Sequence, residues 1–401
     1  MISIEDALRA ITGALETLPA EMVPLSQAAG RVLAADVISR RCQPPVAVSA
    51  MDGWAVRAAD VAQAPAELTE IGESPAGGSF DGTVGPGEAV RIFTGAPLPA
   101  GADCIVIQEN IEAIGKRIKV AVAGRANAHI RAAGLDFRPG QIGLAAGRRL
   151  GPSDIGLAAA MDNPWLSVRR KPRVALLSTG DELVRPGEPI GPNQIVSSNS
   201  FALAALIEAS GGIAIDLGIA RDNRDSLTGL VEAARGFDLL VTLGGISVGA
   251  YDLVRDVLGS RGLRLDFWQI AIRPGKPLMF GECDGIPVLG IPGNPVSSLI
   301  CGVVFLRPAL HRLLGLDDDP IPPASALLGT ELRANDRRQD YIRARLSRNA
   351  AGTEVATPFS TQDSSMLSVL ATADCLIVRP PFAPAAKAGE PVTVIHRAGL
   401  W

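Results

Sequence analysis

The apolar positions of this chain follow a helical period at its start. In residues 3–18 they recur every three or four positions, at Ile4, Leu8, Ile11, Leu15 and Leu18. This spacing places them on one face of a helix. Ser3 and Asp6 have the spacing of a capping box, which predicts that the helix begins there. A second helix is expected at 26–35, with Ser26 as its cap.

The pattern changes between residues 44 and 140. Short apolar runs alternate with turns rich in Gly, Pro and Asn, which is typical of a compact β-rich domain. The runs most like strands are 88–93, 104–108 and 117–122. A helical pattern returns at 153–161, and 169–172 has the composition of a linker.

Strand-like and helical patterns alternate in residues 173–315. The strands are expected at 173–178, 213–218, 238–243 and 286–291, and the helices at 198–210, 225–235, 251–259 and 295–314. Such alternation predicts a parallel sheet covered by helices on both faces. After a linker at 316–320, the chain is β-rich again, with half-exposed strands at 341–346 and 392–395.

These patterns predict a multidomain α/β protein. We expect four domains: a helical and linker domain of 1–43 plus 141–171, an inserted β-rich domain of 44–140, a three-layer α/β domain with a parallel-rich sheet at 172–317, and a C-terminal β domain of 320–401. A chain of 401 residues is long enough for this division.

Charge and composition narrow the class of partner. A net charge of −4 and an aromatic content of 4% argue against a nucleic-acid groove. The most apolar stretch, 286–306, contains three prolines, so we expect no membrane span. The chain starts without a signal-peptide pattern, and its five cysteines form no C-x-x-C pair, so we expect a cytoplasmic protein. Three distant histidines make a histidine-based metal site improbable.

The richest candidate for chemistry is residues 239–252. A buried-strand pattern there runs into a series of small, hydroxyl and acidic residues: Gly244, Gly245, Ser247, Gly249 and Asp252. A strand that ends in glycines lets a ligand lie against the backbone, and a helix that begins next favours an oxyanion. Taken alone, this pattern also fits a turn without a ligand in any α/β protein.

Two other strands end in the same way. One ends in Ser178, Thr179, Gly180, Asp181 and Glu182, and the other in a rigid turn that holds Pro292, Asn294 and Pro295. Ligands of open parallel sheets bind outside the carboxyl ends of the strands. We therefore expect the three strand ends to line one crevice.

The motifs together resemble those of the molybdopterin molybdenumtransferases, the MoeA-type enzymes that share their architecture with the E domain of gephyrin. The motifs that carry the resemblance are 49–54 (SAMDGW), 91–96 (RIFTGA), 130–136 (IRAAGLD), 178–183 (STGDEL), 244–249 (GGISVG) with Asp252, 273–277 (RPGKP) and 292–297 (PGNPVS). They span nearly the whole chain.

The resemblance implies a homodimer of elongated, L-shaped subunits with the active site at the subunit interface. It implies that adenylylated molybdopterin and molybdate react to give molybdenum cofactor and AMP, with Mg²⁺ as the divalent cation. Other cofactor-synthesis proteins and molybdoenzymes are further partners that it leaves open. Neither a nucleic acid nor a membrane is among the partners expected.

The resemblance also assigns roles to residues. The catalytic positions are Asp52, Thr94, Asp136, Glu182, Asp222 and Asp252, of which Glu182, Asp222 and Asp252 are the metal ligands. The substrate-binding positions are Ser178, Thr179, Gly180, Asp181, Gly244, Gly245, Ser247, Gly249, Arg273, Lys276, Pro292, Asn294, Pro295, Arg343 and Ser364. Which acids bind metal and which bind the pterin stays open.

Structural roles compete with several of these assignments. Asp52 and Asp136 each precede or lie in a turn, and Asp181 has the position of a cap. Arg343 and Arg345 alternate on a strand, a pattern usually seen on a solvated face. For Arg273 and Lys276, held between prolines, we expect an anion clamp.

Two other functions remain open. One is the preceding adenylylation of molybdopterin, which needs only a domain like 172–317. The other is a non-catalytic scaffold like gephyrin, which would not need acids at positions 52, 182 and 252.

Overall fold

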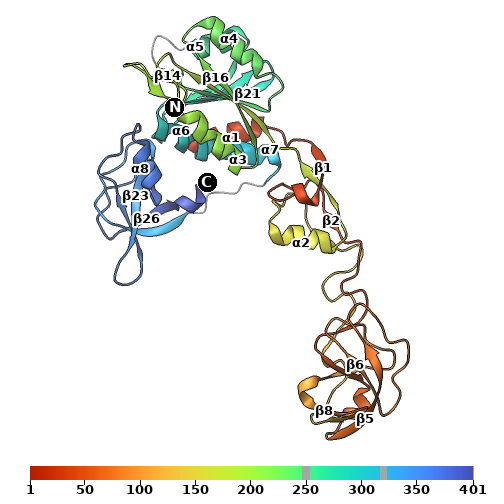
Figure 1. Ribbon diagram of the computed structural model, residues 1–401. Coiled ribbons are helices and arrows are strands. Elements are labelled where there is room, and N and C mark those ends of the chain that lie inside the picture. The colour runs from red at the N-terminus through yellow and green to blue at the C-terminus, as the bar shows by residue number, and fades with distance from the viewer. Residues whose placement is uncertain (246–252, 317–322, 401) are drawn as a thin grey trace. The chain divides into compact units, whose positions relative to one another are not determined.

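The computed structural model describes residues 1–245, 253–316 and 323–400 (Figure 1). The chain forms two compact units. The first consists of Met1–Glu21, Gly30–Ala34 and Val168–Trp401, and the second of Met22–Ala29 and Ala35–Ser167. The chain crosses from one unit to the other within strands β1 (Ala20–Pro24) and β12 (Trp165–Arg169), and again around Gly30–Ala34.

A six-stranded sheet forms the centre of the first unit. Its order is β16 (Ile213–Ala220), β13 (Arg173–Thr179), β17 (Leu239–Leu243), β21 (Ile286–Ile291), β20 (Pro277–Cys283) and β18 (Arg264–Gln269). The first four strands are parallel, and the last two run antiparallel to their neighbours. The four strands expected from the sequence are confirmed, whereas β18 and β20 were not foreseen.

Helices cover both faces of this sheet, as expected (Figure 1). In β13, Val174 and Leu176 point into one core, and Ala175 and Leu177 into the other, because successive side chains of a strand alternate. The first core is closed by α1 (Ile4–Ala14), α3 (Asn199–Ala209), α6 (Pro295–Cys301) and α7 (Arg307–Leu314). The second is closed by α4 (Arg224–Ala233) and α5 (Leu253–Ser260).

One long apolar helix lies at the centre of the first core. It runs over Pro295–Leu314 and includes a π-helical segment, Gly302–Leu306, which ends two residues before Pro308, a residue that lacks an amide hydrogen. The helix is long and apolar enough to cross a membrane, but 78% of its most apolar stretch of 18 residues is buried inside the protein. Its apolar side chains are therefore used in the core.

The C-terminal part of the first unit is a small closed β structure. Its strands are ordered β19 (Ile272–Arg273), β23 (Gln339–Arg348), β24 (Glu354–Pro358), β22 (Ala324–Leu328), β26 (Pro391–His396) and β25 (Cys375–Arg379), and β25 pairs back onto β23. The short β19 comes from the central domain and pairs in parallel with β23. Helix α8 (Leu367–Thr372) completes this part.

The second unit is β-rich. Its six-stranded sheet has the order β7 (Cys104–Ile107), β4 (Gly53–Val56), β6 (Glu88–Ile92), β5 (Ala66–Ser74), β9 (Arg117–Val120) and β8 (Ile111–Ile114). Two short pairs accompany it: β10 (Ile130–Arg131) with β3 (Val48–Ser49), and β11 (Ile142–Leu144) with β2 (Val37–Ile38). Helix α2 (Pro152–Ala160) matches the expected helix.

The predicted multidomain α/β fold class is confirmed, but one predicted helix is wrong. Residues 26–35 do not form an α-helix; a 3₁₀ turn at Leu25–Gln27 is followed by Gly30 at φ 74° and a bridge from Leu33 to Val168. Gly30 adopts the left-handed conformation that ends helices, and Leu33 is used for strand-like pairing instead.

Candidate active site

Three strand ends of the central sheet line one cavity of about 610 Å³. Strand β13 contributes Ser178 and Thr179, strand β17 contributes Gly244 and Gly245, and the turn after β21 contributes residues 292–295. Of the residues assigned to substrate, this cavity therefore collects Ser178, Thr179, Gly244, Gly245, Pro292, Asn294 and Pro295. Ser247, Gly249 and Asp252 lie outside the described residues.

The two glycines after β17 are required by close packing. Gly244 and Gly245 have φ angles of 86° and 66°. A Cβ on Gly245 would lie 2.4 Å from Val254 Cγ2 and 2.8 Å from Thr179 Oγ1. One on Gly244 would lie 3.1 Å from the Thr179 carbonyl oxygen. The backbone is bare here because neighbouring atoms leave no room for side chains.

Glu182 places its carboxylate at this cavity. The preceding Gly180 has φ 142°, and a Cβ on it would lie 2.3 Å from Glu182 Oε2. The carboxylate therefore folds back over Gly180, a position that only glycine allows. The Glu182 side chain is exposed, so the carboxylate is open to a ligand.

Asp181 and Asp222 are neighbours at the same edge of the sheet. The backbone N–H of Asp222 donates to Asp181 Oδ1 at 3.2 Å. Asp181 thus holds the distant loop that carries Asp222, while the side chain of Asp222 is exposed. The helix that follows is capped by Asn223, whose side chain accepts from the Ser226 amide at 2.9 Å.

The sequence interpretation missed one wall of the cavity. Ile195, Val196, Ser197, Ser198 and Asn199 line it, together with Pro277. Asn199 Nδ2 donates to the Gly293 carbonyl at 2.7 Å and so fixes the turn after β21. The run Ser-Ser-Asn-Ser just before a helix was the signal available in the sequence.

A loop of the C-terminal domain closes the cavity from another side. The Ser364 carbonyl accepts from the Val296 amide at 3.0 Å, and Ser365 lines the cavity. The Ser365 hydroxyl donates to Asp363 at 2.7 Å. The backbone of Ser364, a residue assigned to substrate binding, therefore contacts the start of α6.

Arg343 is buried behind this loop, which excludes the solvated-face alternative, and its assignment to the substrate stays a prediction. It is 1% exposed, and it donates from Nε to Gln362 Oε1 at 3.1 Å and from Nη1 to the Asp363 carbonyl at 2.8 Å. Burial lowers the pKa of its guanidinium. Arg345, two residues on, is exposed and lies over the Phe359 ring. Arg343 thus positions the loop that bears Ser364 and Ser365.

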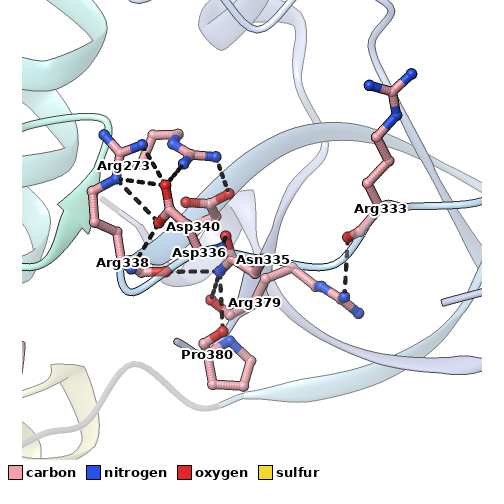
Figure 2. Close-up of polar contacts among 8 residues, drawn as sticks. All are labelled: Arg273, Arg333, Asn335, Asp336, Arg338, Asp340, Arg379 and Pro380. Atoms are coloured by element: carbon pink, nitrogen blue, oxygen red, sulfur yellow. Dashed lines mark hydrogen bonds and ion pairs between the residues drawn. The ribbon is translucent and has the colours of Figure 1, made fainter. Parts of the chain in front are cut away.

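A second cavity, of about 570 Å³, adjoins the C-terminal strands. It is lined by Arg273, Arg343 and residues of the loop 358–362, among others. Arg273 donates to Asp340 at 2.9 Å and is also paired with Asp336 (Figure 2). The guanidinium expected to clamp an anion therefore already has two carboxylate partners. Lys276 is partly exposed and lies in the same segment, between Arg273 and Pro277.

Asp52 and Thr94 meet within the second unit. Asp52 Oδ1 accepts from the Thr94 amide at 2.7 Å and from the Thr94 hydroxyl at 2.8 Å. These two bonds, with a smaller contribution from the charge of Arg91, lower the pKa of Asp52. The carboxylate is thus an ionised, accessible group directly before the first residue of β4, Gly53.

Asp136 lies in the same unit and borders a cavity of about 570 Å³. Gly95, the residue after Thr94, borders this cavity too, as does Arg131. The Asp136 amide donates to the Gln43 carbonyl at 2.9 Å, so the residue has the turn role that the sequence left open. Its side chain is exposed.

The described residues contain no group of three or more His, Cys, Asp or Glu side chains arranged to hold a metal ion. Of the three acids assigned to metal, Glu182 and Asp222 are described and exposed, and Asp252 is outside the described range. These are hard oxygen donors of the kind Mg²⁺ prefers, and Mg²⁺ is commonly bound through one or two carboxylates with waters and substrate phosphates.

Comparisons with known proteins agree over the whole chain. Three family models match it: the MoeA N-terminal region (domain I and II) over residues 2–161, a probable molybdopterin binding domain over 175–312, and the MoeA C-terminal region (domain IV) over 325–396. A relative from Mycobacterium tuberculosis named molybdopterin molybdenumtransferase 2 is 35% identical, over 98% of this chain and 99% of its own length.

Two further matches support the same family. A molybdopterin molybdenumtransferase from Nostoc sp. is 35% identical, over 94% of this chain and 88% of its own length. The crystal structure of a molybdopterin biosynthesis moeA protein from Pyrococcus horikoshii has a TM-score of 0.84 at 28% identity, covering 98% of this chain and 99% of that one.

A glycine-lined cavity at the strand ends of an α/β domain, with hydroxyl and carboxylate groups around it, is typical of a small-molecule binding site. The matches identify the class of protein as a transferase of molybdenum cofactor biosynthesis. The chain belongs to the MoeA family.

Proposed function

We propose that this protein inserts molybdenum into adenylylated molybdopterin, releasing AMP and molybdenum cofactor, the last step of cofactor synthesis. The observation that carries the proposal is the strand-end cavity, where the Glu182 carboxylate faces a floor of glycine backbone and the hydroxyls of Ser178 and Thr179. Its volume of about 610 Å³ suits a ligand of pterin size.

The reaction brings negative charges together, because the substrate carries phosphates and molybdate is a dianion. Two unit charges about 4 Å apart repel by about 4 kcal/mol at an effective dielectric constant of about 20. Mg²⁺ would neutralise part of this charge. We assign Mg²⁺ to the carboxylates of Glu182, Asp222 and Asp252, of which the first two lie among the described residues.

Arg273 and Lys276 are proposed as the clamp for molybdate. The segment 273–277 supports this role because its start, Arg273, borders the second cavity and its end, Pro277, borders the strand-end cavity. The loop 358–365 likewise borders both cavities. An oxyanion held by this segment would lie beside the pterin site.

Asp52, Thr94 and Asp136 are proposed to act from the partner subunit of a homodimer whose active site is shared. The support is chemical: Asp52 is ionised, partly exposed and held by Thr94. We also propose that other cofactor-synthesis proteins and molybdoenzymes are its partners, and that the protein is cytoplasmic. Its five cysteines are all free, as expected in a reducing compartment.

The four-domain division predicted from the sequence is kept as part of the proposal. The family models that end at residue 161, span 175–312 and begin at 325 support boundaries close to 171, 172 and 320. The described strands of 44–140 support an inserted β domain.

The deciding experiment incubates the protein with adenylylated molybdopterin, molybdate and Mg²⁺ and measures AMP by chromatography. We expect AMP release that depends on molybdate. Formation of adenylylated molybdopterin from ATP and molybdopterin, with no molybdate-dependent release, would replace the proposal by the preceding adenylylation. Absence of both activities in a folded dimer would favour a scaffold.

Gly180→Ala is expected to lower the rate of AMP release at least tenfold. The new Cβ would occupy the place of the Glu182 carboxylate, which must then leave its position. Gly187→Ala is the matched control, because Gly187 also has a positive φ, 88°, but open space around it. Both variants lose about 1–3 kcal/mol of folding stability from backbone strain. Equal rates in the two would mean that the Glu182 position is unimportant.

A further inference from the structure

The environment of Arg273 is unusual for an anion-binding residue. Strand β19 pairs in parallel with β23, which sets Arg273 beside Asp340. Its Nη1 donates to Asp340 Oδ2 at 2.9 Å, and its Nη2 is paired with Asp336 (Figure 2). Its side chain is nevertheless 43% exposed, so one side of the guanidinium remains open to a ligand.

Asp336 is held as a permanent carboxylate. Arg338 donates to it from Nη2 at 2.7 Å, from Nε at 3.2 Å and from the backbone amide at 2.9 Å (Figure 2). These bonds, led by that of the Arg338 side chain, hold the pKa of Asp336 well below its ordinary value. The negative charge of Asp336 therefore partly neutralises the positive charge of Arg273 at neutral pH.

Asp340 is a buried counterpart. It is 7% exposed, it borders the second cavity together with Arg273, and its Oδ1 has no hydrogen-bond partner within the described ranges. Burial raises the pKa of this carboxyl, while Arg273 acts in the opposite direction. An unpaired buried carboxylate oxygen is costly, so Asp340 depends on its contact with Arg273.

We propose that Asp336 and Asp340 are specificity-determining residues, which act as counter-ions of Arg273 and compete with the incoming oxyanion for its guanidinium. The inference rests on the proposed function, since it takes Arg273 to bind molybdate. The two carboxylates also repel a bound anion, and they repel a dianion about twice as strongly as a monoanion of the same shape. The pair therefore lowers the affinity for molybdate or tungstate more than the affinity for a singly charged tetrahedral oxyanion.

The test measures binding of two tetrahedral anions, molybdate (dianion) and perrhenate (monoanion), by isothermal titration calorimetry on the full-length protein. Asp336→Asn keeps an oxygen for the Arg338 amide but removes the charge. We expect molybdate to bind about threefold tighter and perrhenate to gain less, so that the preference for molybdate over perrhenate widens. Thermal melting of each variant confirms that it is folded.

Two controls separate this effect from a general change of charge. Glu331→Gln removes a charge from another residue of the same cavity that has no contact with Arg273 in the described structure, and should change both affinities by less than half as much. Arg273→Ala combined with Asp336→Asn should show no gain over Arg273→Ala, because the counter-ion then has no partner.

The outcomes distinguish the inference from the function on which it rests. If Arg273→Ala weakens molybdate binding but Asp336→Asn changes neither anion, the counter-ion role is wrong and the clamp stands. An equal gain from Glu331→Gln also overturns the counter-ion role. If Arg273→Ala leaves molybdate binding unchanged, the clamp itself is wrong and the inference falls with it.

Discussion

Replacement of Glu182 by glutamine is expected to lower the turnover number for AMP release by about a hundredfold, the range seen when a positioned acid or metal ligand is lost. The physical reason is the place of this carboxylate. It is exposed at the cavity formed by the strand ends, and Gly180 leaves it just enough room to fold back. Glutamine has the same shape but carries no charge. The measurement is single-turnover release of AMP from adenylylated molybdopterin.

Glu188→Gln is the matched control for this variant. Glu188 lies six residues after Glu182 and is also exposed; it accepts from the Arg185 amide at 2.9 Å, but it lies outside the cavity. It should keep nearly full activity. The Mg²⁺ concentration for half-maximal rate distinguishes two roles of Glu182: a rise in the variant indicates a metal ligand, and an unchanged value indicates acid–base chemistry. Full activity of Glu182→Gln would remove Glu182 from the site.

Asp52→Asn is expected to reduce the turnover number by a similar factor, about a hundredfold, with a smaller effect on KM. An asparagine oxygen still accepts from the Thr94 amide and hydroxyl, so the turn should keep its shape. Only the charge is lost. Asp60→Asn is the matched control. Asp60 is another acid of the same unit, and it accepts from the Gly87 amide at 3.0 Å. This variant should leave the rate unchanged.

The pH dependence gives a second check on Asp52. A group whose pKa is lowered in the folded protein keeps its charge until the pH falls through the lowered value. Asp52 is thus ionised throughout about pH 5–9, and the slopes of the activity profile in that range belong to other groups. Thr94→Val, which removes one of the two hydrogen bonds, should raise the pKa of Asp52 in a ¹³C-carboxyl NMR titration. An unchanged titration would contradict the role of Thr94.

The sequence predicted the elements that carry strong local signals. Strands β13, β17 and β21 were found because each is a short, mostly apolar run that is followed by glycine or proline, as a buried parallel strand should be. The same runs led to the strand-end cavity, since parallel strands end at one edge. Burial on both faces and the following turn are local properties, and the sequence shows them directly.

Features that depend on distant partners were missed. The segment 26–35 has helical spacing, yet Leu33 pairs with Val168, a residue 135 positions away, and Gly30 turns the chain. Arg343 alternates like a solvated residue, but its partners in the loop at 362–363 are visible only after folding. The two carboxylates beside Arg273 come from strand β23 and the segment just before it, more than sixty residues later. Tertiary contact overrides local pattern at all three places.

The central and C-terminal domains share one apolar core. Leu370, Leu376 and Ile395 belong to the same cluster as Phe305 and Leu310 of the long central helix, and β19 extends from one domain into the sheet of the other. A recombination break point between these two domains would therefore expose apolar core residues of both domains to water. We expect the two domains to be inherited together as one unit.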